Sequence, residues 1–245
     1  MICISSEISN EGKSFTAVQL GNTLSLIDKR VLIIAADLRK SRLHQTFKVS
    51  NELGLSSFLM GKSIQNDIVY PTEFKDLYLI PAGPVPPNPS ELLHSFRMKA
   101  MIDELRSQFD YIIIDCAPIG LVSDAIPLIK LSDINLFIIR AGVSRYSAAL
   151  IPETLSREFA LTNSGIILNS FENDILYTDC YKGRANRTGY YNAYQSQQYY
   201  NKAYQNHHRQ KRSWMFWMNY VIDTLGEVGQ ANISSATFYI IHYPI

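Results

Sequence analysis

Short runs of apolar residues recur along the first two thirds of this chain, and stretches with helical character separate them. The runs predict strands over Met1–Ser5, Val31–Ala35, Leu77–Ile80, Tyr111–Ile114, Ile134–Ile139 and Gly165–Leu168. Strands without polar alternation are typical of a sheet that is covered on both faces. Intervening helices favour right-handed crossovers between parallel strands. The predicted fold class is therefore α/β, with a mostly parallel sheet flanked by helices.

A further helix is predicted to begin at Asn88, because Asn is a good N-cap and Pro89 suits the first helical turn. Its apolar residues recur at roughly helical spacing and predict a buried stripe of Leu92, Leu93, Phe96, Met101, Ile102 and Leu105. The preceding segment Pro81–Pro89 holds five prolines and one glycine, which predicts a rigid loop.

Composition excludes several classes of protein. The chain has 245 residues, 47% of them hydrophobic, which is enough for one large α/β domain or two small ones and excludes wholesale disorder. Its three cysteines, Cys3, Cys116 and Cys180, show neither a disulfide framework nor zinc-ligand spacing, so a reducing cytosol is expected. No apolar run reaches the ~18 residues of a membrane span, and the first residues do not resemble a signal peptide.

The near-zero net charge of +1 hides an uneven distribution. Residues 180–220 contain seven basic side chains and no acidic one, so the rest of the chain carries a net charge of −6. Aliphatic residues become rare after Asn169, while Tyr, Asn and Gln dominate to about Gln210. We therefore expect a domain over residues 1–176 and a flexible, basic, tyrosine-rich tail over 177–212. Residues 213–245 have no clear periodicity and are left unassigned.

The first predicted strand leads into a loop that ends in Gly12-Lys13-Ser14, and a helix is predicted from Phe15 to about Leu26. Strand, loop, Gly-Lys-Ser and helix is the context of a phosphate-binding P-loop, although Glu7 replaces the first glycine of the standard pattern. Lys13 would neutralise phosphate charge, and the Ser14 hydroxyl would bind Mg²⁺. The predicted ATP-binding residues are Ser9, Asn10, Glu11, Gly12, Lys13, Ser14 and Phe15.

Two other predicted strands lead to carboxylates. Asp37 follows Val31–Ala35, and Asp115 follows Tyr111–Ile114. Ligands of parallel α/β sheets bind at the carboxyl ends of the strands. Three strand ends therefore present a Lys-Ser pair and two carboxylates, a combination that favours a nucleotide site over an ordinary helix start.

These residues resemble the cytoplasmic P-loop domain of bacterial tyrosine kinases (BY-kinases) of the capsular exopolysaccharide family. The matching motifs are Ser5–Ser14, Val31–Arg39 and Ile112–Pro118, and the resemblance covers about residues 1–204. The chain is similar, more distantly, to partition and division-site ATPases. The resemblance implies a P-loop NTPase fold of the deviant Walker class, with ATP and Mg²⁺ as cofactors.

The resemblance also implies roles for individual residues. Lys13, Asp37 and Asp115 would be catalytic, and Ser14, Asp37 and Asp115 would surround the metal. Asn169 would lie near the adenine. The family phosphorylates a C-terminal tyrosine cluster in trans, which here corresponds to Tyr177, Tyr181, Tyr190, Tyr191, Tyr194, Tyr199, Tyr200 and Tyr204.

The function so implied is an ATP-dependent protein-tyrosine autokinase that regulates capsular or exopolysaccharide polymerisation and export. The implied partners are other copies of the chain, a membrane polysaccharide co-polymerase or activator, and a protein-tyrosine phosphatase. The implied location is cytoplasmic, at the inner face of the membrane, through a membrane-spanning partner or N-terminal part.

Several alternatives to a fully active kinase stay open. Ala35 occupies the position of the family's first Asp in the D-x-D motif, so the chain could be a slow kinase, an ATP-binding pseudokinase or a non-kinase ATPase switch. Tyrosines interleaved with basic residues also fit a tail that binds nucleic acid. No compact basic domain supports that use, and no nucleic-acid partner is expected.

Overall fold

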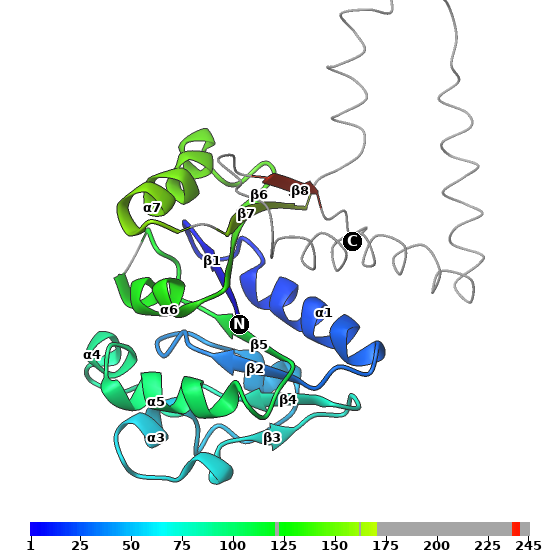
Figure 1. Cartoon of the computed structure of the whole chain (residues 1–245), viewed down its shortest axis with the longest axis vertical. Helices are drawn as coiled ribbons and strands as arrows, with labels where there is room; N and C mark the ends of the chain where they lie inside the picture. Colours follow the sequence, from blue (N-terminus) through cyan, green and yellow to red (C-terminus); the bar gives the residue numbers. More distant parts are fainter. Residues whose placement is uncertain (121–122, 162, 171–236, 241–245) are drawn as a thin grey trace, which may run out of the picture. The chain divides into compact units, whose positions relative to one another are not determined.

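The apolar runs form a single sheet in the computed structural model, which describes residues 1–120, 123–161, 163–170 and 237–240. Within these residues the sheet has eight strands in the order β3-β4-β2-β5-β1-β6-β7-β8 (Figure 1). Only the β3–β4 pairing is antiparallel in this part of the chain. The strands are β1 Ile2–Ser6, β2 Val31–Ala35, β3 Tyr70–Pro71, β4 Leu77–Ile80, β5 Tyr111–Asp115, β6 Ile134–Arg140, β7 Ser164–Asn169 and β8 Thr237–Ile240.

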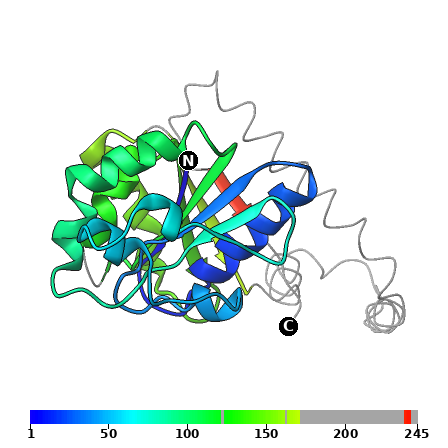
Figure 2. The ribbon, with the colours of Figure 1, turned by 90° about the horizontal axis from the view of Figure 1, so that it is seen from below.

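Helices cover both faces of this sheet. Figures 1 and 2 show α1 on one face and α5 and α6 on the opposite face. In the part of the chain that the structure describes, the α-helices are α1 Lys13–Leu26, α2 Leu43–Thr46, α3 Leu55–Leu59, α4 Pro89–Leu93, α5 Phe96–Leu105, α6 Ile126–Leu131 and α7 Ile151–Phe159. The same described residues also form three short 3₁₀ helices, η1 Gln65–Asp67, η2 Ser123–Ala125 and η3 Tyr146–Leu150. The predicted class, a mostly parallel α/β sheet flanked by helices, is confirmed.

Burial of the central strands explains why their sequences lack polar alternation. Every residue of β1 and of β2 is buried, including Ile4 and Ile33, which have no exposed surface. Each fully buried aliphatic side chain contributes roughly 1.5–3 kcal/mol of transfer free energy. The parallel register then brings the carboxyl ends of β1, β2 and β5 to the same edge of the sheet. Ala35 lies opposite Asp115 in the β2–β5 pair, and Ile4 lies opposite Asp115 in the β1–β5 pair.

One helix prediction was partly wrong. The segment from Asn88 forms two helices, α4 and α5, because Ser95 begins a new helix by accepting the backbone N–H of Met98 at 3.2 Å. The second helix therefore starts with a new orientation of its side chains. Met101 is buried as expected, whereas Phe96 is 83% exposed. Phe96 consequently does not belong to the predicted core stripe.

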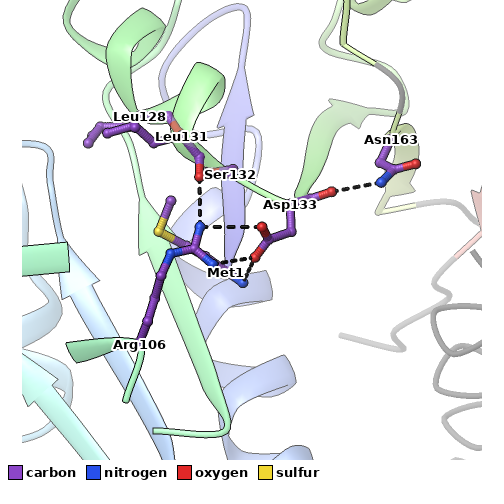
Figure 3. A network of polar contacts seen from close by, with 7 residues as sticks. All are labelled: Met1, Arg106, Leu128, Leu131, Ser132, Asp133 and Asn163. Atoms are coloured by element: carbon purple, nitrogen blue, oxygen red, sulfur yellow. Dashed lines mark hydrogen bonds and ion pairs between the residues drawn. The ribbon is translucent and has the colours of Figure 1, made fainter. Parts of the chain in front are cut away.

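A polar network joins elements at the amino edge of the sheet (Figure 3). The Asp133 carboxylate accepts hydrogen bonds from the Arg106 guanidinium, at 2.9 and 3.3 Å, and forms an ion pair with the amine of Met1. Arg106 also donates to the Leu131 carbonyl at 2.8 Å, and the Asn163 amide donates to the Asp133 carbonyl at 3.0 Å. Burial opposes ionisation, but the bonds from Arg106 hold the pKa of Asp133 below its ordinary value. The network joins elements at the amino ends of the strands, and the predicted site residues lie at the opposite, carboxyl edge.

The unassigned C-terminal stretch contributes a strand, since β8 pairs in parallel with β7 over Gly165–Leu168. The proposed boundaries of the tail, and its eight tyrosines, lie outside the described residues. Where the structure describes the chain, none of its helices has the length and apolar character needed to cross a bilayer.

Candidate functional site

The loop between β1 and α1 has the shape of a phosphate cradle. Asn10 adopts a left-handed backbone with φ of 66°, and Gly12 caps the helix with φ of 101°. A Cβ on Gly12 would lie 2.0 Å from the Asn169 amide nitrogen, so the loop has no room for a side chain there. Ser9 and Asn10 are exposed, and α1 begins at Lys13, two residues earlier than predicted. Backbone N–H groups at such a helix start attract anions.

Lys13 is 7% exposed and lies along the inside of this loop. Its ammonium donates to the Ser6 hydroxyl at 2.9 Å and to the Ile8 carbonyl at 3.4 Å. Burial lowers the pKa of Lys13, while the negative charges of Asp115, Asp37 and Glu11 oppose that shift. A phosphate group in the cradle would favour the charged ammonium, so Lys13 is suited to anion binding.

Ser14 and Asp115 lie in direct contact although 101 positions separate them in sequence. The Ser14 hydroxyl donates to Asp115 Oδ2 at 2.6 Å. Asp115 is 1% exposed, and its other oxygen, Oδ1, has no hydrogen-bond partner among the described residues. Burial raises the pKa of Asp115 to about 6, and the Ser14 hydrogen bond and the Lys13 charge act against that rise. A carboxylate with one unpartnered buried oxygen is costly unless a ligand completes its contacts.

Asp37 lies next to this pair but uses its side chain differently. Its Oδ1 accepts the backbone N–H groups of Arg39 at 3.1 Å and Lys40 at 3.0 Å, which closes the turn after β2. Its own N–H donates to the Asp115 carbonyl at 3.1 Å. Asp37 is therefore held at the carboxyl edge, where its charge acts on Lys13. Ala35, opposite Asp115 in the register, is fully buried and offers only a methyl group.

The donor set suits Mg²⁺. Ser14 offers a hydroxyl and Asp115 offers a carboxylate with an unpartnered oxygen, both hard oxygen donors. Magnesium commonly keeps several waters and takes one or two protein ligands together with substrate phosphates. Among the described residues no group of three or more His, Cys, Asp or Glu side chains could hold a metal by itself. A site completed by nucleotide phosphates agrees with both observations.

A second set of contacts around the loop was not predicted. Glu11 was expected to contribute its backbone, yet its carboxylate is fully buried, accepts the Ile8 N–H at 2.7 Å and is bonded by the Ser144 hydroxyl. Arg140 donates to the Asn10 carbonyl at 3.0 Å, and the Asn169 amide donates to the Glu11 carbonyl at 2.9 Å. The ends of β6 and β7 therefore hold the loop from outside. Proximity of Asn169 to an adenine stays a prediction.

A second polar cluster lies at the end of the β2 motif. The Arg39 guanidinium donates to Asp124 Oδ2 at 2.9 Å, and the Ser90 hydroxyl donates to the same carboxylate. Burial disfavours the charged form of Asp124, but the hydrogen bonds from Arg39 and Ser90 hold its pKa below the ordinary value. Arg39 ends the Val31–Arg39 motif that carried the family resemblance, although none of the three was predicted as a site residue. The position of Arg39 at the end of that motif was the signal that could have indicated this cluster.

Of the predicted site residues, Lys13, Ser14, Asp37 and Asp115 lie at one edge of the sheet. Phe15 follows on α1 and is exposed. The eight predicted phosphoacceptor tyrosines lie outside the described residues. A cradle with a buried lysine, joined to a serine–aspartate pair, defines a P-loop nucleotide-binding protein of the deviant Walker class.

Comparison with known proteins narrows this class. A family model described as an AAA domain matches residues 1–150. Tyrosine-protein kinase ptk of Acinetobacter johnsonii is 34% identical over 172 residues, covering 70% of this chain and 24% of that protein. Tyrosine-protein kinase CpsD of Streptococcus agalactiae serotype III is 34% identical over 176 residues, covering 71% of this chain and 76% of that protein. The chain thus spans about a quarter of one relative and three quarters of the other.

Solved structures match this chain as well, among them a bacterial tyrosine-kinase domain. The kinase domain of Escherichia coli tyrosine kinase ETK matches with a TM-score of 0.67 and 30% identity, over 77% of this chain and 70% of that one. The septum site-determining protein MinD of Pyrococcus horikoshii, solved with Mg-ADP, has a TM-score of 0.58 and 23% identity over 68% of each chain, which shows a shared fold. The chain belongs to the bacterial tyrosine-kinase family.

Proposed function

We propose that this protein is an ATP-dependent protein-tyrosine autokinase that phosphorylates the tyrosines of its own C-terminal segment, one copy acting on another. The contact between the Ser14 hydroxyl and the buried Asp115 carboxylate, directly behind the Lys13 cradle, is the observation that carries the proposal. Its relatives named as tyrosine-protein kinases support the class of reaction. The proposed acceptors are Tyr177, Tyr181, Tyr190, Tyr191, Tyr194, Tyr199, Tyr200 and Tyr204.

The residues of the loop would bind and orient the triphosphate. Backbone N–H groups at the start of α1 would surround the β-phosphate, and the Lys13 ammonium would bridge the β- and γ-phosphates. Lys13 would exchange its contact with the Ile8 carbonyl for phosphate oxygens. Bound Mg²⁺, held by Ser14 and Asp115, would supply charge neutralisation for phosphoryl transfer. The tyrosine oxygen would then attack the γ-phosphorus in line with the leaving ADP.

The proton of the attacking phenol needs an acceptor, since a free phenol has a pKa near 10. Ala35 cannot accept it, and Asp37 is the carboxylate that remains on the same turn. Because one oxygen of Asp37 is engaged by two backbone N–H groups, its other oxygen is the candidate base. General-base assistance typically contributes about 10²–10⁴-fold to a rate. We therefore propose an active kinase that is slower than one with both carboxylates.

We further propose that the kinase regulates capsular or exopolysaccharide polymerisation and export. It would act from the cytoplasmic face of the membrane with a polysaccharide co-polymerase as partner, and a protein-tyrosine phosphatase would reverse the modification. The crystal structure of the chimerical protein CapA2B2 matches this chain with a TM-score of 0.66 and 30% identity, over 69% of this chain and 75% of that one.

A second candidate is a nucleotide switch that hydrolyses ATP without modifying tyrosine. The methyl group of Ala35 favours this switch, because β2 offers no carboxylate at the position paired with Asp115 of β5. Incubation with Mg²⁺-ATP, with parallel measurement of ADP and of phosphotyrosine, separates the two. The kinase yields phosphotyrosine that disappears in Lys13→Met. ADP without phosphotyrosine contradicts the kinase and favours the switch.

A further inference from the structure

Among the tyrosines whose side chains the structure describes, one is far more exposed to solvent than the others. Tyr146 is 92% exposed. Tyr70, Tyr78 and Tyr111 are only half-exposed, and the ring of Tyr78 packs edge-on against Phe109 with 5.4 Å between centroids. Phosphoryl transfer requires a phenol that can enter a site whose Lys13 and Asp115 are buried. Of these four tyrosines, Tyr146 is the most exposed and therefore the best suited to enter the site of another copy.

The position of Tyr146 connects it to the phosphate loop. It begins η3, and Ser144 lies two residues before it. The Ser144 hydroxyl bonds the buried Glu11 carboxylate and accepts the Arg140 backbone N–H at 2.8 Å. Arg140 in turn donates from its side chain to the Asn10 carbonyl. A change of charge at Tyr146 is therefore introduced beside the segment that holds the cradle from outside.

The charges near Tyr146 favour a phosphate there. Arg145 is the adjacent residue, is exposed, and forms no ion pair with any described residue. Phosphotyrosine adds roughly −1.5 to −2 charges at pH 7 and offers strong acceptor oxygens, for which an arginine is a suitable donor. The same negative charge would repel a nucleotide triphosphate and compete for the Arg140 guanidinium that supports the loop.

We propose that Tyr146 is a phosphoacceptor of this kinase, modified by a second copy of the chain, and that its phosphate weakens nucleotide binding. The proposal rests on the tyrosine-kinase activity proposed above. The Tyr146 oxygen forms a bond to the γ-phosphorus of ATP while the bond from that phosphorus to the β,γ-bridging oxygen breaks. ADP leaves with that oxygen, and the phenol proton passes to the free carboxylate oxygen of Asp37 in the copy that acts as enzyme. Phosphorylation of this surface tyrosine would thus lower the affinity of the phosphate loop for nucleotide, independently of the C-terminal tyrosines.

The first test uses two copies of the full chain that can be told apart by mass. A Lys13→Met chain carrying an isotope label serves as acceptor, and the unlabelled natural chain serves as enzyme, with Mg²⁺-ATP. Phosphopeptide mapping of the labelled chain is expected to find phosphate on Tyr146. Phosphate on C-terminal tyrosines with none on Tyr146 overturns this inference and leaves the proposed function intact. Phosphate on no tyrosine of either copy overturns both.

The second test measures the consequence. In a full chain with the eight C-terminal tyrosines replaced by Phe, phosphorylation is expected to raise the dissociation constant of Mg²⁺-ADP on the order of fivefold, because added like charge acts across a screened distance. Adding Tyr146→Phe should remove both the phosphate and the change in affinity. The matched half-exposed substitution Tyr111→Phe should leave both in place. Phosphate on Tyr146 with unchanged affinity overturns the regulatory part of the inference.

Discussion

Replacement of Asp115 by Asn should stabilise the unliganded protein at high pH while it abolishes metal-dependent activity. The Asp115 carboxyl is fully enclosed, Oδ1 has no partner among the described residues, and its pKa lies at about 6 against an ordinary 3.8. Below pH 3.8 the carboxyl is neutral in the folded and the unfolded chain and costs nothing. As pH rises from 3.8 to 6, the unfolded chain releases its proton first, so the free energy of unfolding falls. Well above pH 6 the carboxyl is ionised in both states, and the free energy of unfolding no longer changes with pH through this group.

The size of this effect follows from the two pKa values. Each pKa unit corresponds to about 1.4 kcal/mol. The raised pKa of Asp115 therefore lowers the free energy of unfolding by roughly 3 kcal/mol at pH 8 and by about 1 kcal/mol at pH 4.5. Asn has nearly the shape of Asp and can still accept the Ser14 hydroxyl through its oxygen, so the hydrogen bond of 2.6 Å can persist. We therefore expect Asp115→Asn to gain about 2 kcal/mol more at pH 8 than at pH 4.5.

Urea unfolding followed by far-ultraviolet circular dichroism, for both chains at both pH values, measures this difference. Asp124→Asn is the matched control, because Asp124 is also buried but its pKa is lowered by Arg39 and Ser90 despite its burial. Its substitution should destabilise the protein, and more at pH 8 than below pH 4. A gain for Asp115→Asn that is the same at both pH values would refute the reasoning, since a pH-independent gain cannot come from ionisation.

Three further predictions concern the cradle and its surroundings. Ala35→Asp should raise the initial rate of autophosphorylation, measured with labelled ATP and Mg²⁺, by about tenfold or more, because it restores a carboxylate beside Asp115. Gly12→Ala should weaken Mg²⁺-ADP binding at least tenfold by calorimetry, because its Cβ would lie 2.0 Å from the Asn169 amide and φ is 101°. Ser144→Ala should weaken Mg²⁺-ADP binding by about fivefold, because it leaves one oxygen of the buried Glu11 carboxylate without its donor.

Each of these three has an outcome that contradicts it. An unchanged rate for Ala35→Asp would mean that the methyl group is not what limits transfer. Gly12→Ala binding at the natural affinity would show that the observed loop is not the form that holds phosphate. Ser132→Ala is the control for Ser144→Ala. The Ser132 hydroxyl donates to the Leu128 carbonyl at 2.7 Å, at the other end of β6. Equal effects from both would indicate general destabilisation instead of a role at the loop.

Six strands of the sheet could be predicted from the sequence, because their apolar runs are buried between neighbouring strands with helices on both faces, whereas β3 and β8 were not predicted. The Lys13, Ser14 and Asp115 positions followed from the same reasoning, since strand ends of a parallel sheet meet at one edge. The bounds of strands moved by one residue, as with Asp115, which belongs to β5. Such small shifts arise where the backbone hydrogen bonds between strands continue past the last apolar side chain.

The contacts that hold the loop from outside could not be predicted in this way. Ser144 and Glu11 are 133 positions apart, and neither an isolated serine nor a buried glutamate has a periodicity that indicates its partner. The exposure of Phe96 depended on where one helix ended and the next began, and Ser95 begins the second helix by accepting the Met98 backbone N–H with its hydroxyl oxygen. Long-range polar pairs and helix breaks depend on tertiary packing, which apolar periodicity alone does not encode.

The central claim is that the Lys13, Ser14 and Asp115 site transfers phosphate to tyrosine. Mapping phosphate on the full chain after incubation with Mg²⁺-ATP, beside Lys13→Met and Asp115→Asn, tests it most directly. The account predicts phosphate on tyrosines of residues 177–204 in the natural chain and none in either variant. Phosphotyrosine that persists in Lys13→Met, or a natural chain that binds Mg²⁺-ATP and forms no phosphotyrosine, would contradict it.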